Sequence, residues 1–171
     1  MEYQHLSHPF PPLWDQDSRL LILGSFPSVK SREAMFFYGH PQNRFWKVIA
    51  ALCRESVPTT IPEKSTLLHK HHIALWDVIQ SCDIIGSSDS SIKNVVPNPL
   101  GDIIDQSQIT VVFNNGRTSQ KLYEKYTAPK LQLEGHYLPS TSPANASWTL
   151  PKLITEWGSQ LGPYLDSTNE N

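Results

Sequence analysis

Residues 20–24 read Leu-Leu-Ile-Leu-Gly, an uninterrupted apolar run that stops at a glycine. Such a run is typical of a strand that is buried on both faces of a parallel sheet and ends in a tight loop. Two similar runs, Ile-Ala-Leu-Trp at residues 73–76 and Ile-Thr-Val-Val-Phe at residues 109–113, predict two more strands. A fourth strand is expected within residues 131–138. Together these segments would form a central sheet.

Helical patterns lie between the predicted strands. From Arg44 onward, apolar residues recur at helical spacing, and Asn43 is placed to cap that helix. A second helix is predicted over about residues 62–71, and Ser147 is expected to cap the last helix. Residues 77–98 show little periodicity and are expected to form a long loop. The remaining helices are predicted over about residues 99–105, 117–125 and 148–161.

Strands that alternate with helices predict an α/β fold, a three-layer α/β/α sandwich around a short, mostly parallel central sheet. A chain of 171 residues suits one domain, which we place at residues 19–165. Residues 1–18, rich in proline and histidine, are expected to be an extended lead-in. Residues 166–171 are expected to be a polar tail.

Composition limits the compartment and the kind of partner. The two cysteines indicate neither a disulfide framework nor a thiolate metal site. No apolar stretch reaches the roughly 18 residues that span a bilayer, so we expect a soluble cytoplasmic protein without a membrane partner. The formal net charge is −2. This charge neither supports nor excludes a nucleic-acid ligand, because neutral side chains, backbone N–H groups and helix N-termini also bind phosphates.

The loops that follow the strands carry the unusual residues. In parallel α/β sheets, ligands bind beyond the carboxyl ends of the strands, so these loops are expected to converge. The first loop contains Gly24, which permits close approach of a ligand, the aromatic residues 36–38, and the amide of Asn43. An aromatic face with an amide is how proteins hold an unstacked nucleobase. The structural alternative is that the aromatic residues cover the core and Asn43 caps a helix.

A family resemblance begins at these residues. The stretch Tyr-Gly-His-Pro-Gln-Asn-Arg-Phe-Trp-Lys-Val at residues 38–48 resembles the segment after the first motif of mismatch-specific uracil-DNA glycosylases. Gly-Ser-Phe-Pro-Ser at residues 24–28 stands in the place of their Gly-Ile-Asn-Pro-Gly loop. Where those enzymes carry an Asn, or their relatives an Asp, to position the attacking water, this chain has Phe26, which cannot hold a water.

With Ser-Thr-Ser-Pro-Ala-Asn at residues 140–145, these stretches are similar to the hypoxanthine-DNA glycosylase branch of the uracil-DNA glycosylase superfamily, over about residues 20–157. The resemblance implies a uracil-DNA glycosylase-like fold. It also implies a monofunctional DNA glycosylase that hydrolyses the N-glycosidic bond of deaminated bases, hypoxanthine first among them, in base-excision repair. We expect it to need no metal or organic cofactor and to act as a monomer on DNA that contains a deaminated base. Its place would be the nucleoid, or the nucleus of a eukaryote.

The resemblance also assigns roles to residues. It gives the catalytic role to Asn43, and Tyr38 is expected to stack on the base. Asn115 is expected to read the polar edge of the base, with Asn114 as the alternative. Backbone N–H groups near Ser25 and Phe26, with Asn115, would stabilise the leaving base, and Gly24 would let the backbone approach the base closely. DNA contacts are expected from Ser28, Ser140, Thr141, Ser142, Pro143, Ala144 and Asn145, with Ser140 standing where many relatives carry a histidine.

Several alternatives remain open. His-Lys-His-His at residues 69–72 is interpreted as a solvated helix end rather than a metal site, because a metal needs further ligands and a supporting shell. The same scaffold could serve a uracil or thymine mismatch glycosylase, against which Phe26 counts, or a non-catalytic nucleic-acid-binding module. A phosphate-binding enzyme built on residues 24–28 is disfavoured because that loop lacks the glycine spacing and lysine of known phosphate loops.

Overall fold

The computed structural model describes residues 2–165 of the chain. Its centre is a parallel sheet of four strands in the order β3-β2-β6-β7. Its first two strands in chain order, β2 and β3, are buried at every residue, as expected for the inside of a parallel sheet. All four predicted strands are present, namely β2 (Leu20–Gly24), β3 (Ile73–Asp77), β6 (Val111–Asn115) and β7 (Gly135–Leu138).

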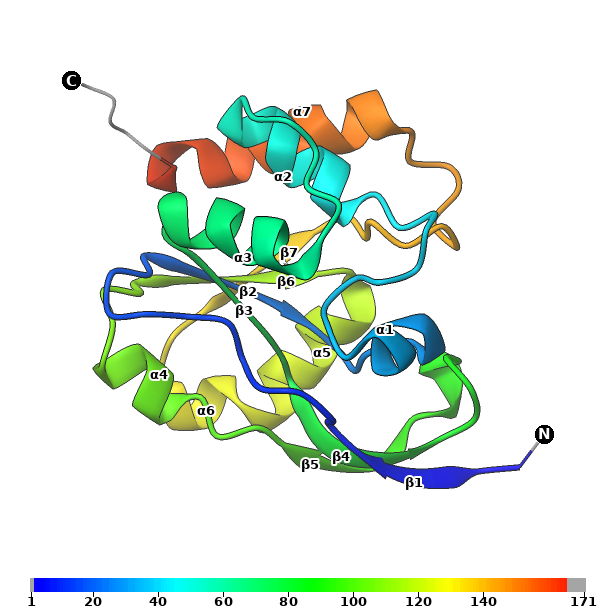
Figure 1. Cartoon of the computed structure of the whole chain (residues 1–171). Coiled ribbons are helices and arrows are strands. Elements are labelled where there is room, and N and C mark those ends of the chain that lie inside the picture. The colour runs from blue at the N-terminus through cyan, green and yellow to red at the C-terminus, as the bar shows by residue number, and fades with distance from the viewer. Residues whose placement is uncertain (1, 166–171) are drawn as a thin grey trace.

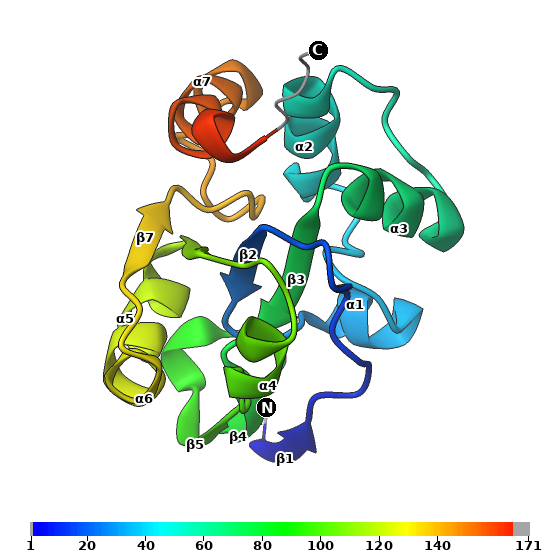
Figure 2. The same cartoon turned by 90° about the vertical axis from the view of Figure 1, so that its left-hand side faces the viewer.

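Helices cover both faces of this sheet (Figure 1), and the view turned by 90° shows the same layers (Figure 2). One face carries α2 (Phe45–Cys53), α3 (Ile61–Lys70) and α7 (Leu150–Leu161). The other face carries α4 (Gly101–Asp105), α5 (Arg117–Tyr126) and α6 (Ala128–Leu131). The predicted three-layer α/β/α sandwich is therefore confirmed.

Two helix starts differ in detail from the sequence prediction. The backbone N–H of Phe45 donates to Asn43 Oδ1 at 2.9 Å, so Asn43 does satisfy a free donor at the start of α2. It does so from one position before the N-cap residue, which is Arg44. Helix α7 is capped by Thr149 rather than Ser147, because the Thr149 side chain accepts a backbone N–H of the first turn.

A second, smaller sheet was not foreseen in the sequence. It is antiparallel, in the order β1-β4-β5, and consists of β1 (Gln4–Ser7), β4 (Ile79–Ile84) and β5 (Lys93–Pro97). The prediction of a long loop over residues 77–98 is therefore wrong. The small sheet buries three of its own side chains, and its register shifts twice between β4 and β5. In β4, buried and more exposed side chains alternate only over residues 82–84, a run too short to indicate a strand in a sequence.

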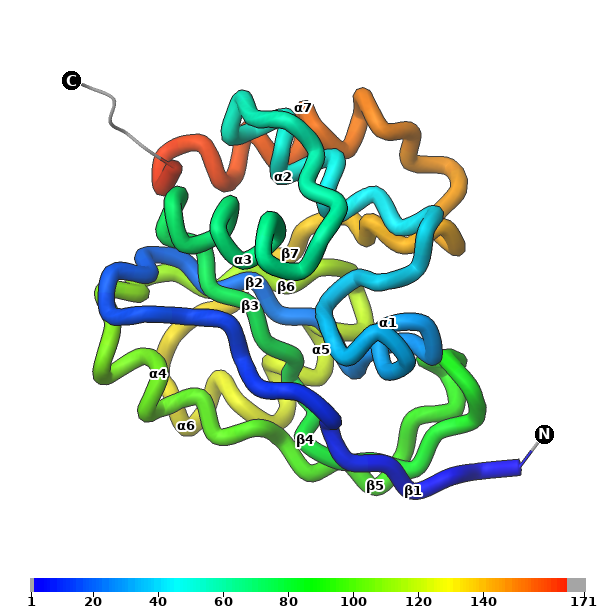
Figure 3. The backbone as a smooth tube through the Cα atoms, in the orientation of Figure 1, coloured from blue at the N-terminus to red at the C-terminus, as the bar shows by residue number. Residues whose placement is uncertain are grey.

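The N-terminal segment before β2 is part of the folded structure. Strand β1 pairs with β4, and Leu13 forms an antiparallel bridge with Leu75 of β3. Figure 3 shows this dark blue segment running from the small sheet across the molecule before it enters β2. The segment therefore contacts the domain that was expected to begin after it.

Short elements complete the described part of the chain. Helix α1 (Val29–Ala34) lies within the first long loop, and the 3-10 helix η1 (Asp89–Ser91) lies between β4 and β5. A second 3-10 helix, η2 (Gly162–Tyr164), follows α7. The predicted polar tail, residues 166–171, lies outside the described residues. Within residues 2–165, none of the helices has the length and apolar character that crossing a membrane requires.

The main core lies between the central sheet and the layer of α2 and α7. Phe45 and Val48 of α2 and Trp157 of α7 are fully buried there. Burying side chains of this size stabilises the fold by about 1.5–3 kcal/mol each. The indole N–H of Trp157 donates to the carbonyl oxygen of Pro139 at 2.9 Å. The core thereby anchors the backbone at the start of the loop that follows β7.

Candidate active site

The carboxyl ends of the four parallel strands meet at one cavity of about 400 Å³. The loops predicted to converge therefore do so, as expected for an α/β sheet. Pro143 and Asn145 are the two predicted site residues that do not line the cavity. The predicted residues that do line it are Gly24, Ser25, Phe26, Ser28, Tyr38, Asn43, Asn115, Ser140, Thr141, Ser142 and Ala144.

Three polar side chains form a chain of hydrogen bonds along one side of the cavity. The Thr141 hydroxyl donates to Asn43 Oδ1 at 2.8 Å. Asn115 Nδ2 donates to Thr141 Oγ1 at 3.0 Å, and the backbone N–H of Thr141 donates to Asn115 Oδ1 at 3.1 Å. Thr141 is fully buried and belongs to the loop of residues 139–149 between β7 and α7, called the late loop below. The network therefore joins the end of β6, the late loop and the start of α2 in a fixed arrangement.

The network determines which atoms of Asn43 are available. Asn43 Oδ1 accepts two hydrogen bonds, from Phe45 N–H and from Thr141 Oγ1. An N–H donor facing Oδ1 also fixes which end of the amide is oxygen and which is nitrogen. No hydrogen bond within residues 2–165 uses Asn43 Nδ2. The N–H groups of Nδ2 are therefore available to hold a water molecule or a ligand atom.

Arg44 ties the late loop to the start of α2 from behind the cavity. Its guanidinium donates to the carbonyl oxygens of Ser142 at 2.8 Å and Asn145 at 3.2 Å, and also to that of Trp148. Its backbone N–H donates to the carbonyl oxygen of Thr141 at 3.1 Å. Since a guanidinium offers five donors in a rigid fork, one side chain can hold several turns of this loop. From the sequence alone, this arginine was expected only to begin a helix.

Tyr38 lies in the cavity wall in a left-handed backbone conformation, with φ of 52°. Its ring stacks on Phe45, with 4.2 Å between ring centroids and 20° between the ring planes. Burial, aided by the negative charge of Asp77, raises the pKa of the Tyr38 hydroxyl, and an interaction with Asn115 acts in the opposite direction. The hydroxyl therefore stays neutral across the physiological pH range, and the ring is held in place from one side.

The two neighbouring asparagines at the end of β6 point to different places. Asn114 is fully buried, accepts from the Ser119 hydroxyl at 2.7 Å and donates to Gln120 Oε1 at 2.9 Å. Asn115 lines the cavity. The side chain at the cavity is therefore that of Asn115, although its amide already bonds to Thr141 on both its oxygen and its nitrogen.

Asp77 lies at the cavity beside Gly24 and was not singled out in the sequence. A Cβ atom placed on Gly24 would lie 2.5 Å from Asp77 Oδ1 and 3.3 Å from the Tyr38 hydroxyl oxygen. Only glycine therefore fits beside this carboxyl group. The signal that could have found Asp77 is an acidic residue directly after a buried apolar strand, in a parallel sheet whose strand ends bind ligands.

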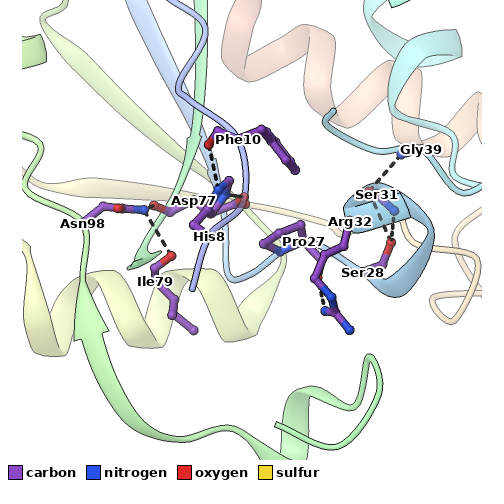
Figure 4. A network of polar contacts seen from close by, with 10 residues as sticks. All are labelled: His8, Phe10, Pro27, Ser28, Ser31, Arg32, Gly39, Asp77, Ile79 and Asn98. Atoms are coloured by element: carbon purple, nitrogen blue, oxygen red, sulfur yellow. Dashed lines mark hydrogen bonds and ion pairs between the residues drawn. The ribbon is translucent and has the colours of Figure 1, made fainter. Parts of the chain in front are cut away.

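His8 holds the other oxygen of the same carboxyl group. His8 Nε2 lies 2.6 Å from Asp77 Oδ2, and the side chains of His8 and Asp77 are 2% and 6% exposed. The second ring nitrogen, Nδ1, lies 2.9 Å from the carbonyl oxygen of Phe10. Figure 4 shows this chain of contacts, together with Asn98, whose Nδ2 donates to the carbonyl oxygen of Asp77 at 2.8 Å.

Phe26 and Asp89 complete the outer part of the cavity. The Phe26 ring packs against the core of the small sheet and lies under the Arg32 guanidinium, 5.7 Å from the ring centroid. It has no polar atom with which to hold a water. Desolvation raises the pKa of Asp89, while interactions with Thr118 and Ser25 lower it.

The histidine-rich segment at residues 69–72 lies at the end of α3 and pairs with acidic side chains. His69 Nδ1 lies 3.0 Å from Asp15 Oδ2. Glu55 Oε2 lies 2.5 Å from His71 Nε2 and 2.9 Å from Lys70 Nζ. These pairs link α3 to the N-terminal segment and to the residues after α2, rather than to the cavity.

Comparison with known proteins places this geometry in a family. The chain matches the family described as the uracil DNA glycosylase superfamily over residues 11–159. The chain belongs to this superfamily. Two curated proteins similar to this chain are both named hypoxanthine DNA glycosylase. The one from Methanosarcina acetivorans is 33% identical over 153 residues, which cover 86% of this chain and 93% of that protein. The one from Methanosarcina barkeri is 32% identical over 112 residues, which cover 64% and 71%.

A solved structure agrees with the superfamily assignment. The solution NMR structure of a candidate uracil DNA glycosylase from Methanosarcina acetivorans superposes with a TM-score of 0.79 at 28% identity. The match covers 94% of this chain and 99% of that one. The uracil-DNA glycosylase-like fold expected from the sequence is therefore confirmed, and so is the superfamily that the motifs indicated.

Proposed function

We propose that this member of the uracil DNA glycosylase superfamily is a monofunctional DNA glycosylase that removes deaminated bases from DNA, with hypoxanthine as its main substrate. Two relatives are named for that base. The observation that carries the proposal is the orientation of Asn43: its oxygen is held by two hydrogen bonds, and its Nδ2 is available at the cavity that Tyr38 also lines.

In the proposed reaction, the damaged nucleotide swings out of the duplex and its base enters the cavity against Tyr38. The loop of residues 140–145 braces the DNA strand, and Ser28 contacts its backbone. Asn43 Nδ2 donates to the oxygen of a water molecule and holds it at C1′ of the sugar. This role needs no strong base, because the sugar is already electrophilic as the bond to the base breaks.

The bond changes balance without a cofactor. The water oxygen forms a bond to C1′, and the bond between C1′ and the base nitrogen breaks with its electron pair remaining on the base. The water loses a proton to solvent, and the base takes up a proton from solvent. Backbone N–H groups of Ser25 and Phe26 would stabilise the negative charge on the leaving base.

Base recognition in this proposal involves Asp77 as well as Asn115. Asp77 Oδ1 accepts no hydrogen bond from residues 2–165 and lies at the cavity beside Gly24. Hypoxanthine carries an N1–H donor that this oxygen can accept. Adenine, from which hypoxanthine arises, instead has a lone pair at N1 that would face the lone pairs of Oδ1. The parent base is thereby disfavoured.

The proposed site lies entirely within one chain, which supports action as a monomer. Its substrate would place the enzyme at the nucleoid, or in the nucleus of a eukaryotic cell. No metal is part of the proposed chemistry, and no cluster of three or more metal-ligating side chains occurs within residues 2–165.

A base-release assay on defined oligonucleotides tests the proposal. Purified protein would be mixed with duplex and single-stranded DNA carrying hypoxanthine, uracil, xanthine or adenine at one position, and the free base measured by chromatography. We expect release of hypoxanthine, and strand breaks only after alkali treatment, because a monofunctional glycosylase leaves an intact abasic strand. An Asn43→Ala preparation excludes a contaminating glycosylase. Tight binding without release would indicate a non-catalytic module, and release of uracil alone would indicate a uracil-specific enzyme.

A further inference from the structure

His8 and Asp77 form a buried pair directly under the cavity, and nothing in the proposed reaction yet uses the histidine. Their side chains are 2% and 6% exposed. The His8 ring packs among aromatic rings, with centroids 4.3 Å from Trp76, 4.6 Å from Phe10 and 6.0 Å from Phe26. In so apolar a place an ionised carboxyl group is costly unless it is paired and hydrogen-bonded. His8 is the side chain that pairs with it.

The contacts of the ring fix how many protons the pair holds. A carbonyl oxygen can only accept, so His8 Nδ1, 2.9 Å from the Phe10 carbonyl oxygen, carries a hydrogen. His8 Nε2 and Asp77 Oδ2 are only 2.6 Å apart, and two lone pairs cannot face each other at that distance. A second proton therefore lies between these two atoms. Wherever it sits in the bond, histidine and carboxyl group together carry no net charge.

Neutrality matters because of the charge that develops during base release. When the bond between base and sugar breaks, the electron pair stays on the base, which becomes an anion in the cavity. An unpaired carboxylate at Asp77 would repel that anion across a poorly solvated gap, where charges interact strongly. The proton shared with His8 removes this repulsion and still leaves Oδ1 free to accept a hydrogen bond from the base.

We propose that His8 is a positioning residue for base release: through the proton shared with Asp77, it keeps the pair without net charge and holds Oδ1 toward the cavity. This inference rests on the proposed glycosylase function. It also gives the N-terminal segment a part in the site. His8 precedes the superfamily match, which begins at residue 11, and lies outside the domain expected from the sequence.

Other titratable groups near the pair define what a pH experiment must separate. Tyr38 faces Asp77 across Gly24, and burial keeps its hydroxyl neutral. Asp89 lines the same cavity, and the Arg32 guanidinium lies over the Phe26 ring. All three groups are unchanged in the variants below, so a difference between their pH profiles reports on the pair.

The decisive variant is His8→Gln. A glutamine can still donate a hydrogen bond to Asp77 Oδ2, but it cannot supply a proton, so the carboxylate keeps its charge. We expect the single-turnover rate of hypoxanthine release at pH 7.5 to fall by at least about 10-fold, with DNA affinity changed by less than about 3-fold. We also expect the rate of this variant, unlike that of the unaltered protein, to rise as the pH is lowered, because protonation of Asp77 restores neutrality.

A double variant separates charge from packing. In His8→Gln combined with Asp77→Asn, the amide at position 77 keeps an oxygen toward the cavity and carries no charge. We expect this double variant to release hypoxanthine at least about 5-fold faster than His8→Gln alone, a non-additive result that a purely structural role does not produce. A double variant no faster than the single one would overturn the inference.

The control variant is His5→Gln. His5 Nδ1 lies 2.7 Å from Asp83 Oδ1, a second His–Asp pair in the same N-terminal segment, but the His5 side chain is 65% exposed and does not line the cavity. Its replacement should leave the release rate and its pH profile unchanged. If His5→Gln lowered the rate as much as His8→Gln, the effect would belong to the segment as a whole and the inference would fail.

A measurement on the unaltered protein covers the case in which His8→Gln does not fold. Proton NMR of the full chain should show a far-downfield resonance for the proton between His8 Nε2 and Asp77 Oδ2, assigned by nitrogen-15 correlation to the His8 ring. Nitrogen-15 chemical shifts showing that one nitrogen of the His8 ring has neither a proton nor a hydrogen bond would overturn the inference.

If the unaltered protein releases no base from any oligonucleotide, the glycosylase proposal itself fails. Normal release with an unaffected His8→Gln rate removes only the role of His8.

Discussion

The Thr141 hydroxyl donates a hydrogen bond of 2.8 Å to Asn43 Oδ1, and so joins two loops that are 98 residues apart in the chain. With the bond from Phe45 N–H, this contact occupies the oxygen of the amide proposed to be catalytic. The nitrogen, rather than the oxygen, is therefore the end of Asn43 that remains available for a further hydrogen bond. This geometry gives distinct expectations for neighbouring substitutions.

The first prediction concerns Asn43 itself. Asn43→Ala should lower hypoxanthine release at least about 100-fold, because a water held in the wrong place loses most of its reactivity. Asn43→Asp keeps the oxygen that accepts from Phe45 but removes the Nδ2 donor, so it should be similarly slow while keeping the start of α2 intact. Single-turnover kinetics with an inosine-containing duplex would measure both rates, and gel-shift titration would check that binding remains. An Asn43→Asp enzyme as fast as the unaltered protein would remove Nδ2 from the mechanism.

The second prediction concerns Thr141, whose hydroxyl links Asn43 to Asn115. Thr141→Val keeps the shape of the side chain but leaves Asn115 Nδ2 without its partner, which should lower the free energy of unfolding by about 1–2 kcal/mol. Without the hydroxyl, Asn43 also loses one of its two fixed contacts, so the release rate should fall by about 10-fold. Urea denaturation and single-turnover kinetics would measure the two effects.

Thr127 provides the matched control for this substitution. It is 4% exposed, and its hydroxyl has no hydrogen-bond partner within residues 2–165. Thr127→Val should therefore leave stability unchanged or raise it slightly, because an unsatisfied buried hydroxyl is costly, and the release rate should not change. Equal losses in the Thr127→Val and Thr141→Val proteins would mean that the Thr141 hydroxyl network has no special role.

The third prediction concerns Tyr38 as the stacking surface. Tyr38→Ala should weaken base release by about 1–3 kcal/mol of lost stacking. Tyr38→Phe should retain most of the activity, because the Tyr38 hydroxyl makes no hydrogen bond of normal geometry within residues 2–165 and the ring stack on Phe45 would persist. Rates for both variants would be compared at saturating enzyme. If Tyr38→Ala were as fast as the unaltered protein, the platform would have to be another ring, and Phe37, 3% exposed, is the nearest candidate.

The parts of the fold that could be predicted are those that bury long apolar stretches. Strands β2, β3 and β6 each begin with a continuous apolar run, and α2 shows a clear helical repeat, so a local pattern was enough. Strand β4 alternates serine and aspartate with a few buried residues, and its pairing with β1 joins residues 4–7 to 81–84. A contact so distant in the chain leaves no local signal.

The site shows the same division between local and distant information. Asn43 and Tyr38 were found because they lie in a motif of contiguous residues. Asp77 and His8 are 69 residues apart and meet only because the N-terminal segment passes across β3. Arg44 was visible as a helix-start residue, but its bonds to the late loop span about 100 residues and depend on where that loop folds back. Sequence patterns therefore locate the cavity residues of a contiguous motif better than the residues that distant parts of the chain bring to the same place.

The last prediction concerns pH and the link between α2 and α3. Hydrogen bonds from His71 and then Lys70 hold the pKa of Glu55 below its ordinary value of 4.5. A carboxyl group whose pKa is lower in the folded than in the unfolded state stabilises the fold above the unfolded pKa, and this contribution is lost as the pH falls through the folded pKa. Glu55→Gln should therefore lower the free energy of unfolding at pH 6 by about 0.5 kcal/mol, since the group is partly exposed. The difference between the two proteins should shrink as the pH falls below 4.5 and through the lowered pKa of the folded state. Urea denaturation at pH 6 and pH 3.5 would measure this difference.

The control is Glu33→Gln. The Glu33 carboxylate makes a looser, exposed pair with Lys30 at 3.6 Å, so its replacement should change stability less at pH 6. A Glu55→Gln loss that is the same at both pH values would show that the carboxylate charge does not stabilise this junction.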